Sequence, residues 1–204
     1  LEDELDWLNR QVLEDFFADQ ADRVVSRFPK GRKQTPGDLL PEEERRLLEA
    51  LLQPHVLAGI EAGFDFAAGQ LGLAPDFNEA DPRVLEILEG AAGRVVGIDE
   101  ETRRILSVIL SEGRSAGWSV QQYTEAIRNS SGFSQARAER IARTELGTAD
   151  NRGAVERYRA AGIEQVQIID GPACGWSSHD DADFANGSIR SLAEAQGNPL
   201  SHPN

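Results

Sequence analysis

Apolar residues recur at helical spacing over the first part of the chain. The repeat comprises Leu5, Leu8, Val12, Phe16, Val24 and Phe28. This spacing predicts an amphipathic helix over residues 2–28, which Pro29 would end. The helix is either an arm over about residues 1–30 that docks onto a partner, or a helix folded back onto the protein's own bundle.

Further helical patterns follow a loop from Lys30 to Pro41 that is rich in Lys, Gly and Pro. Two helices are expected over Glu42–Gln53 and Pro54–Leu73, because proline suits the first turn of a helix. Another helix is expected to begin at Asp81-Pro82, where an N-cap residue precedes a proline. The helical pattern of this segment weakens through several glycines up to Gly97. This weakening predicts a domain boundary at Gly97.

The second half of the chain predicts three helices and a small mixed tail. The helices are expected over Asp99–Ala116, Ser119–Asn129 and Ser134–Gly162. The tail is expected to hold a strand near Val166–Ile169, an Asn186-Gly187 hairpin, a return strand at Ser188–Arg190 and a helical turn capped by Ser191. The chain is therefore predicted to be mainly α, with an N-terminal helical region over residues 1–97, then a three-helix bundle with a small α+β tail over residues 98–204.

The longest predicted helix, Ser134–Gly162, has an unusual inner face. At 100° per residue, one stripe carries Ala138, Ile141, Ala142, Glu145, Thr148, Ala149, Arg152 and Val155. Because buried charges need partners, Glu145 and Arg152 are expected to form a polar cluster that holds a neighbouring segment. Thr148 and Arg143 complete this cluster. The alternative is a helix with ordinary structural salt bridges.

Glycines inside the predicted helices indicate places where another backbone approaches closely. Each glycine in a helix interior costs roughly 1 kcal/mol relative to alanine, so a packing reason is expected. The candidates are Gly147 and Gly153 in the long helix, and Gly59, Gly63, Gly69 and Gly72 in the helix expected from Pro54.

Composition changes the picture mainly through charge. The net charge of -14 speaks against DNA binding, because phosphate neutralisation requires clustered Lys and Arg. The basic cluster Lys30, Arg32 and Lys33 is too small for that role, so a basic protein partner is expected instead.

One cysteine permits no internal disulfide and fits a reducing compartment. No apolar run reaches the roughly 18 residues of a membrane span. The chain begins at Leu1 and contains no Met, so a longer product is expected.

Candidate metal ligands occur in the tail. Cys174 and His179 lie close together in a loop that contains Gly and Pro, and His202 falls in the segment that should return beside them. A thiolate and two imidazoles suit Zn²⁺, which takes four tetrahedral ligands at structural sites. The fourth ligand would come from Asp180, Asp181 or Asp183. The alternative is an ordinary polar loop without a metal.

The residues offer little for catalysis. No Gly-x-Ser-x-Gly segment is present, and Ser177, Ser178 and His179 are adjacent in sequence, which does not build a Ser-His pair. No Gly-rich loop that could hold a phosphate follows a predicted strand. Enzyme activity and small-molecule binding are therefore not expected.

Several of these features follow one another in an ordered series. The string Arg-Ala-Glu-x-Ile-Ala-Arg-Thr-Glu spans Arg137–Glu145. It is followed by Ala149, Asn151, Gly153 and Tyr158, then by Asp170-Gly171, Cys174, Trp176, Asn186-Gly187 and His202-Pro203-Asn204. In this order they resemble the Mu F-type phage head morphogenesis family, over about residues 98–204. The family pattern closes with a Cys after the position of Asn204, and the resemblance implies this residue as a fourth zinc ligand.

The resemblance implies a minor capsid or head morphogenesis protein of a tailed bacteriophage. Such a protein would bind the portal protein and other head proteins, and act in head assembly, DNA packaging or genome delivery. It would reside in the virion after assembly in the cytoplasm of the bacterial host. Two alternatives remain. One is the non-catalytic part of a fusion that carries an enzyme, such as a capsid maturation protease or a toxin. The other is a metal-stapled nucleic-acid binding module.

Overall fold

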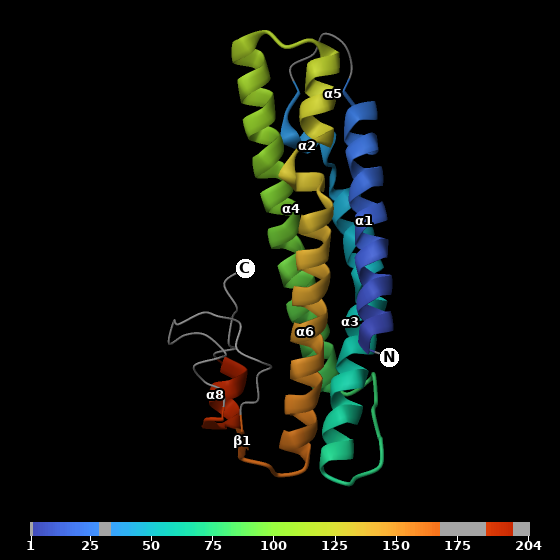
Figure 1. Cartoon of the computed structure of the whole chain (residues 1–204), viewed down its shortest axis with the longest axis vertical. Coiled ribbons are helices and arrows are strands. Elements are labelled where there is room, and N and C mark those ends of the chain that lie inside the picture. Colours follow the sequence, from blue (N-terminus) through green and yellow to red (C-terminus); the bar gives the residue numbers. More distant parts are fainter. Residues whose placement is uncertain (1, 29–33, 168–186, 198–204) are drawn as a thin grey trace. The chain divides into compact units, whose positions relative to one another are not determined.

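The computed structural model describes residues 2–28, 34–167 and 187–197, and the side chains of residues 10–28, 34–167 and 187–194. The fold is mainly helical, as predicted, with a small antiparallel sheet near the C-terminus (Figure 1). The chain divides into two compact units. Unit 1 comprises Leu1–Gly59 and Glu79–Ala149, and unit 2 comprises Ile60–Asn78 and Asp150–Asn204. These bounds differ from the expected division at residue 97, so each unit is described by itself.

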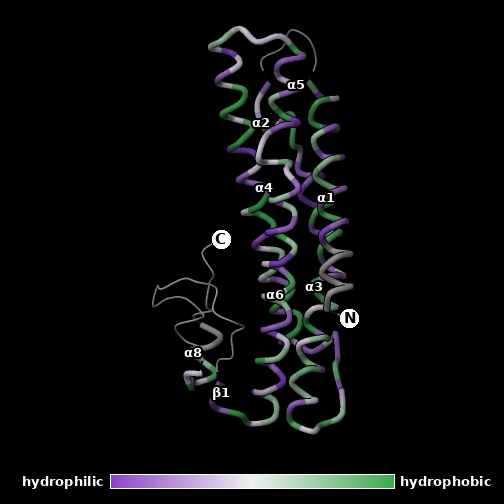
Figure 2. Tube along the Cα trace, viewed as in Figure 1, coloured by the Kyte–Doolittle hydropathy of each residue, from purple (hydrophilic) through white to green (hydrophobic). Residues whose placement is uncertain are grey.

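Helix α1 spans Glu2–Ser26, close to its predicted range. Side chains four or three residues apart on one face are buried in the core of unit 1: Leu13, Phe17, Ala21 and Val24. Figure 2 shows hydrophobic and hydrophilic residues mixed along the coloured part of this helix. The described part of α1 therefore packs within the bundle, which favours the folded-back helix over a free docking arm. The short helix α2, Pro36–Leu39, follows within the expected loop.

Helix α3 is continuous from Glu42 to Gln70, and the prediction of two helices meeting at Pro54 is wrong. A proline in a helix interior costs roughly 3 kcal/mol. The side chain of Pro54 is exposed, so its ring displaces no core residue. One buried stripe continues through the proline, formed by Leu48, Leu52, Val56 and Ile60. Each of these side chains contributes about 1.5–3 kcal/mol on burial, so together they outweigh the cost of the proline.

Helix α4, Pro82–Ala116, also runs through a predicted break. It starts as expected, with the Asp81 side chain accepting a hydrogen bond from the Arg83 amide. The predicted start of a new helix at Asp99 is wrong. Asp99 is buried within α4 and accepts a hydrogen bond from Arg103 Nε at 2.6 Å. Helix α4 ends at Gly117, which is left-handed with φ +67°.

The remaining helices of unit 1 confirm their predicted caps. In α5, Val120–Arg128, the Ser119 hydroxyl and the Gln122 side chain form the expected capping box. A 3-10 turn, η1, covers Ser131–Phe133, and α6 spans Gln135–Ala160. The apolar core joins side chains of α1, α2 and α3 to those of α4, α5 and α6. The predicted three helices are thus part of a larger bundle and do not form one of their own.

The C-terminal part of unit 2 holds two paired strands close to the predicted positions, while Asn186 of the predicted hairpin turn lies outside the described residues. Strand β1, Gln165–Gln167, pairs antiparallel with β2, Ile189–Ser191, and Val166 lies opposite Arg190. Helix α8, Leu192–Gly197, begins directly after β2. Its expected capping box is present, because Glu194 accepts from the Ser191 amide while the Ser191 hydroxyl accepts from the Glu194 amide. The predicted strand residues beyond Gln167 lie outside the described residues.

Candidate functional site

The predicted zinc ligands cannot be placed. Cys174, His179 and His202 lie outside the described residues, as do the three candidate aspartates. Within the described ranges, no group of three or more His, Cys, Asp or Glu side chains could hold a metal ion. In the same ranges, no helix combines the length and apolarity needed to cross a membrane. The zinc site therefore stays a prediction, and the candidate site that the structure describes is the polar face of α6.

The inner face of α6 agrees with the predicted stripe over its unit 1 part. Buried on this face are Ala138, Ile141, Ala142, Glu145 and Ala149. The other members of the predicted polar cluster lie further out: Thr148 and Arg152 are half-buried, and Arg143 is exposed. The structure thus brings Glu145 into the core and leaves Arg143 facing solvent.

Glu145 pairs with Arg94 of α4, which the sequence analysis missed. Arg94 Nε lies 3.0 Å from Oε1 and 2.9 Å from Oε2 of Glu145 and donates to both. Nη2 lies 2.8 Å from Oε2 outside hydrogen-bonding geometry, so its attraction is electrostatic. The Glu145 side chain is only 6% exposed and that of Arg94 is 30% exposed. The pair therefore joins α4 to α6 across the inner face of the bundle.

Arg152 is not the ionic partner of Glu145, contrary to the prediction. Residues seven positions apart on a helix are separated by about 10 Å along its axis, which exceeds ion-pair range. Among the described residues, no ion pair joins the two side chains. The sequence did contain a signal that Arg94 is near the core, since Arg94 lies beside the apolar positions Ala91 and Val95 on a helix. An arginine at the edge of a core stripe calls for an acidic partner.

Arg137, also on the inner face of α6, is buried, and none of the described carboxylates forms an ion pair with it. Nη1 donates to Thr102 Oγ1 at 2.8 Å and to the Gly132 carbonyl at 2.5 Å, and Nη2 donates to the Ile98 carbonyl at 2.8 Å. The guanidinium carbon lies 5.2 Å from the ring centre of Phe17. Burial lowers the pKa of Arg137 below its usual value. This one side chain therefore connects α6 with α4, η1 and α1.

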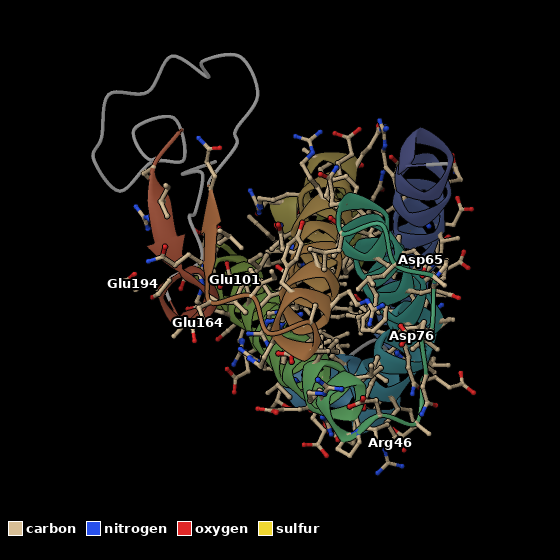
Figure 3. All side chains as sticks on the ribbon, turned by 90° about the horizontal axis from the view of Figure 1, so that it is seen from below. Arg46, Asp65, Asp76, Glu101, Glu164 and Glu194 are labelled. Carbon is tan, nitrogen blue, oxygen red and sulfur yellow. The ribbon has the colours of Figure 1, made fainter. Side chains whose placement is uncertain are left out.

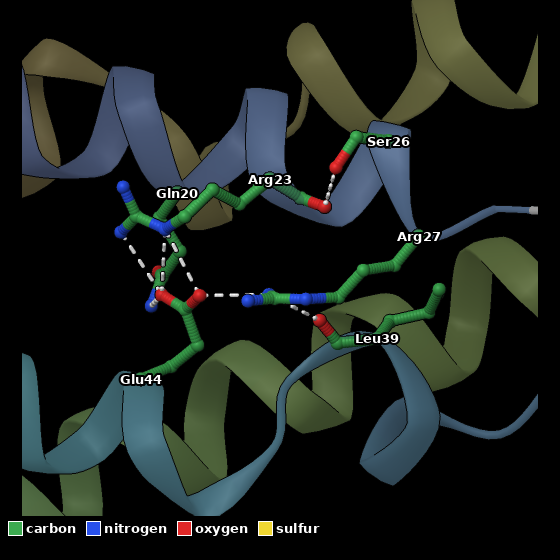
Figure 4. Close-up of polar contacts among 6 residues, drawn as sticks. All are labelled: Gln20, Arg23, Ser26, Arg27, Leu39 and Glu44. Carbon is green, nitrogen blue, oxygen red and sulfur yellow. Dashed lines mark hydrogen bonds and ion pairs between the residues drawn. The ribbon is translucent and has the colours of Figure 1, made fainter.

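A second ionic centre of unit 1 surrounds Glu44, whose side chain is fully buried (Figure 4). Its carboxylate accepts from Arg23 Nε at 2.9 Å, from Arg27 Nη1 at 2.7 Å and from Gln20 Nε2 at 3.3 Å. Burial raises the pKa of Glu44, but the hydrogen bonds from Arg23 and Arg27 outweigh burial and leave it lowered. Arg27 also donates to the Leu39 carbonyl. The centre therefore fixes α1 against α2 and α3.

In unit 2, the buried Arg157 of α6 holds the connection that follows α3. Nη1 lies 3.0 Å from Oδ1 of Asp76, which Figure 3 labels, and Nη2 donates to the Ala74 carbonyl at 3.3 Å. The guanidinium carbon lies 5.2 Å from the ring centre of Phe64. Phe64 in turn packs edge to face on Phe77, with the ring centres 5.7 Å apart. Arg157 thus plays in unit 2 the connecting role that Arg137 plays in unit 1.

Two glycines of unit 2 allow α3 and α6 to approach closely. A Cβ atom added at Gly153 would overlap the carbonyl oxygen of Ile60, and one added at Gly63 would overlap that of Asp150. The predicted close approach is therefore confirmed at Gly63 and Gly153. At Gly147, Gly69 and Gly72, no described atom of another element lies within 4 Å of an added Cβ atom, so the described residues do not support a close approach there.

These centres share a chemistry of arginines held by carboxylates, carbonyls and aromatic rings of other elements. Such groups orient and join helices, and each is held by partners within its own unit. The residues that carry the resemblance accordingly fall on both faces of α6, with Arg137 and Glu145 inside and Arg143 outside. Comparison of the chain with known protein families, with curated proteins and with solved structures gave no match.

Proposed function

We propose that this protein is a minor capsid or head morphogenesis protein of a tailed bacteriophage. It binds the portal protein and other head proteins and acts in head assembly, DNA packaging or genome delivery. The observation that carries the proposal is the ordered series of residues from Arg137 to Tyr158, continued by the Cys, Trp and His-Pro-Asn positions of the tail. The proposed protein is located in the virion and is assembled in the cytoplasm of the bacterial host.

The packing of α6 supports a structural role for the series. Arg137 and Glu145 lie eight residues apart within it, and each contacts α4 through its charged group. Gly153, also part of the series, lies where a side chain would collide with α3. These positions therefore share a structural role, because each one determines how closely another element packs on α6. These contacts give the series a structural role within the chain, and the proposal assigns no catalytic step to it.

The charge of the chain supports a protein partner. The net charge is -14, so a DNA backbone would be repelled, whereas a basic surface on a head protein would be attracted. Attraction between charged surfaces speeds association and weakens as salt is added. Direct binding to DNA is accordingly not part of the proposal.

The test is a pull-down of the full chain against purified portal protein of the same phage. Deleting α1 would be a poor variant, since it removes Phe17 and Val24 from the core. The control bait is an unrelated protein of similar size and net charge, which exposes binding by charge alone. We expect the chain, and not the control, to retain portal protein at moderate salt. Equal retention by both, or by neither, would contradict the portal assignment and favour either the non-catalytic part of an enzyme fusion or a different capsid partner.

A further inference from the structure

We draw no further inference here: the strongest candidate, the solvent-facing side of α4 on which the exposed Leu85 and Val96 accompany Gly93 and Gly97, carries nothing because the described part of the structure does not show what covers it.

Discussion

Three of the buried ionic groups in unit 1 differ in how their charge is balanced. Glu44 has two arginines, Glu145 has one, and Arg137 is held by neutral oxygens and an aromatic ring. Removing one partner of a buried pair costs more than the pair contributes, because the remaining charge stays out of water. Substitutions at these residues should therefore cost stability according to which charge is left buried.

For the Arg94 and Glu145 pair, the two single substitutions should differ. Arg94→Ala leaves the buried Glu145 carboxylate without its cation and should lower the free energy of unfolding by about 3 kcal/mol. Glu145→Ala should cost less, about 2 kcal/mol, because the Arg94 side chain is 30% exposed and can reach water. Urea unfolding of both variants, followed by circular dichroism, measures the difference.

The matched control is the pair of Arg104 and Glu101 on the outside of α4. Here Arg104 donates to Glu101 through Nε and Nη2 within one helix, and the side chains are 66% and 46% exposed. Arg104→Ala should therefore change the free energy of unfolding much less than Arg94→Ala does. An equal loss for Arg94→Ala and Arg104→Ala would show that the inner pair is solvated.

At Glu44 the structure predicts a dependence of stability on pH. The pKa of Glu44 is lower in the folded protein than its ordinary value of 4.5. The resulting stabilisation is fully present above that value and is lost as the pH falls through the folded-state pKa. Free energies of unfolding measured between pH 7 and pH 3 should fall more for the wild type than for Glu44→Gln. Glu43→Gln, on the exposed side of the same turn, should follow the wild type; a parallel fall in all three would contradict the prediction.

At the scale of elements, the helix ends were predictable and the helix continuations were not. Local chemistry determines a cap, and Ser119, Asp81-Pro82 and Gly117 all act as their sequence indicates. Whether a helix continues through Pro54 or Gly97 depends on side chains buried against other elements, which a local pattern does not contain. The same limit applies to the polar site.

Periodicity alone placed Glu145 on the inner face, because that inference needs only the geometry of one helix. Its partner Arg94 is 51 residues away in sequence, and pairing across that distance follows from the tertiary packing of α4 on α6. Pairing with Arg152 was the nearest choice that a single helix offered. The contacts of Arg137 with the Ile98 and Gly132 carbonyls could not be predicted from the sequence either. Every residue has a backbone carbonyl, so the sequence does not indicate which ones accept a hydrogen bond.

The two glycines of α6 provide a matched test of helix packing. Gly147→Ala should raise the free energy of unfolding by about 0.5–1 kcal/mol, because alanine favours the helix and no described atom of another element lies within 4 Å of the added methyl group. Gly153→Ala should lower it by about 1–3 kcal/mol, because the methyl group collides with the backbone of α3 at Ile60. Chemical denaturation of both variants gives the sign directly, and a stabilising Gly153→Ala would exclude the close approach.

At the scale of the whole molecule, unit 1 is built from two separate stretches of chain. Leu1–Gly59 supplies α1, α2 and most of the buried stripe of α3, while Glu79–Ala149 supplies α4, α5 and the first part of α6. The apolar core contains side chains from both stretches. The apolar side chains of each stretch are therefore buried only when the other stretch packs against them. Unit 1 should therefore fold only when both stretches are present.

A fragment of residues 98–204 tests this organisation. It lacks α1 and α3 and begins inside α4, so it exposes core residues such as Leu106 and Ile127. We expect the fragment to show no cooperative unfolding transition in urea, whereas the full chain unfolds with a steep one. A cooperative transition of the fragment would instead support the division of the chain at residue 97.

The discontinuity of unit 1 has a consequence for synthesis on the ribosome. Arg137, whose side chain covers the ring of Phe17, and the core residue Ala142 are synthesised about 120 residues after Phe17. At about 5–20 residues per second, the apolar face of α1 is without its last partners for about 6–25 s. During that interval the nascent chain presents the kind of surface that holding chaperones bind.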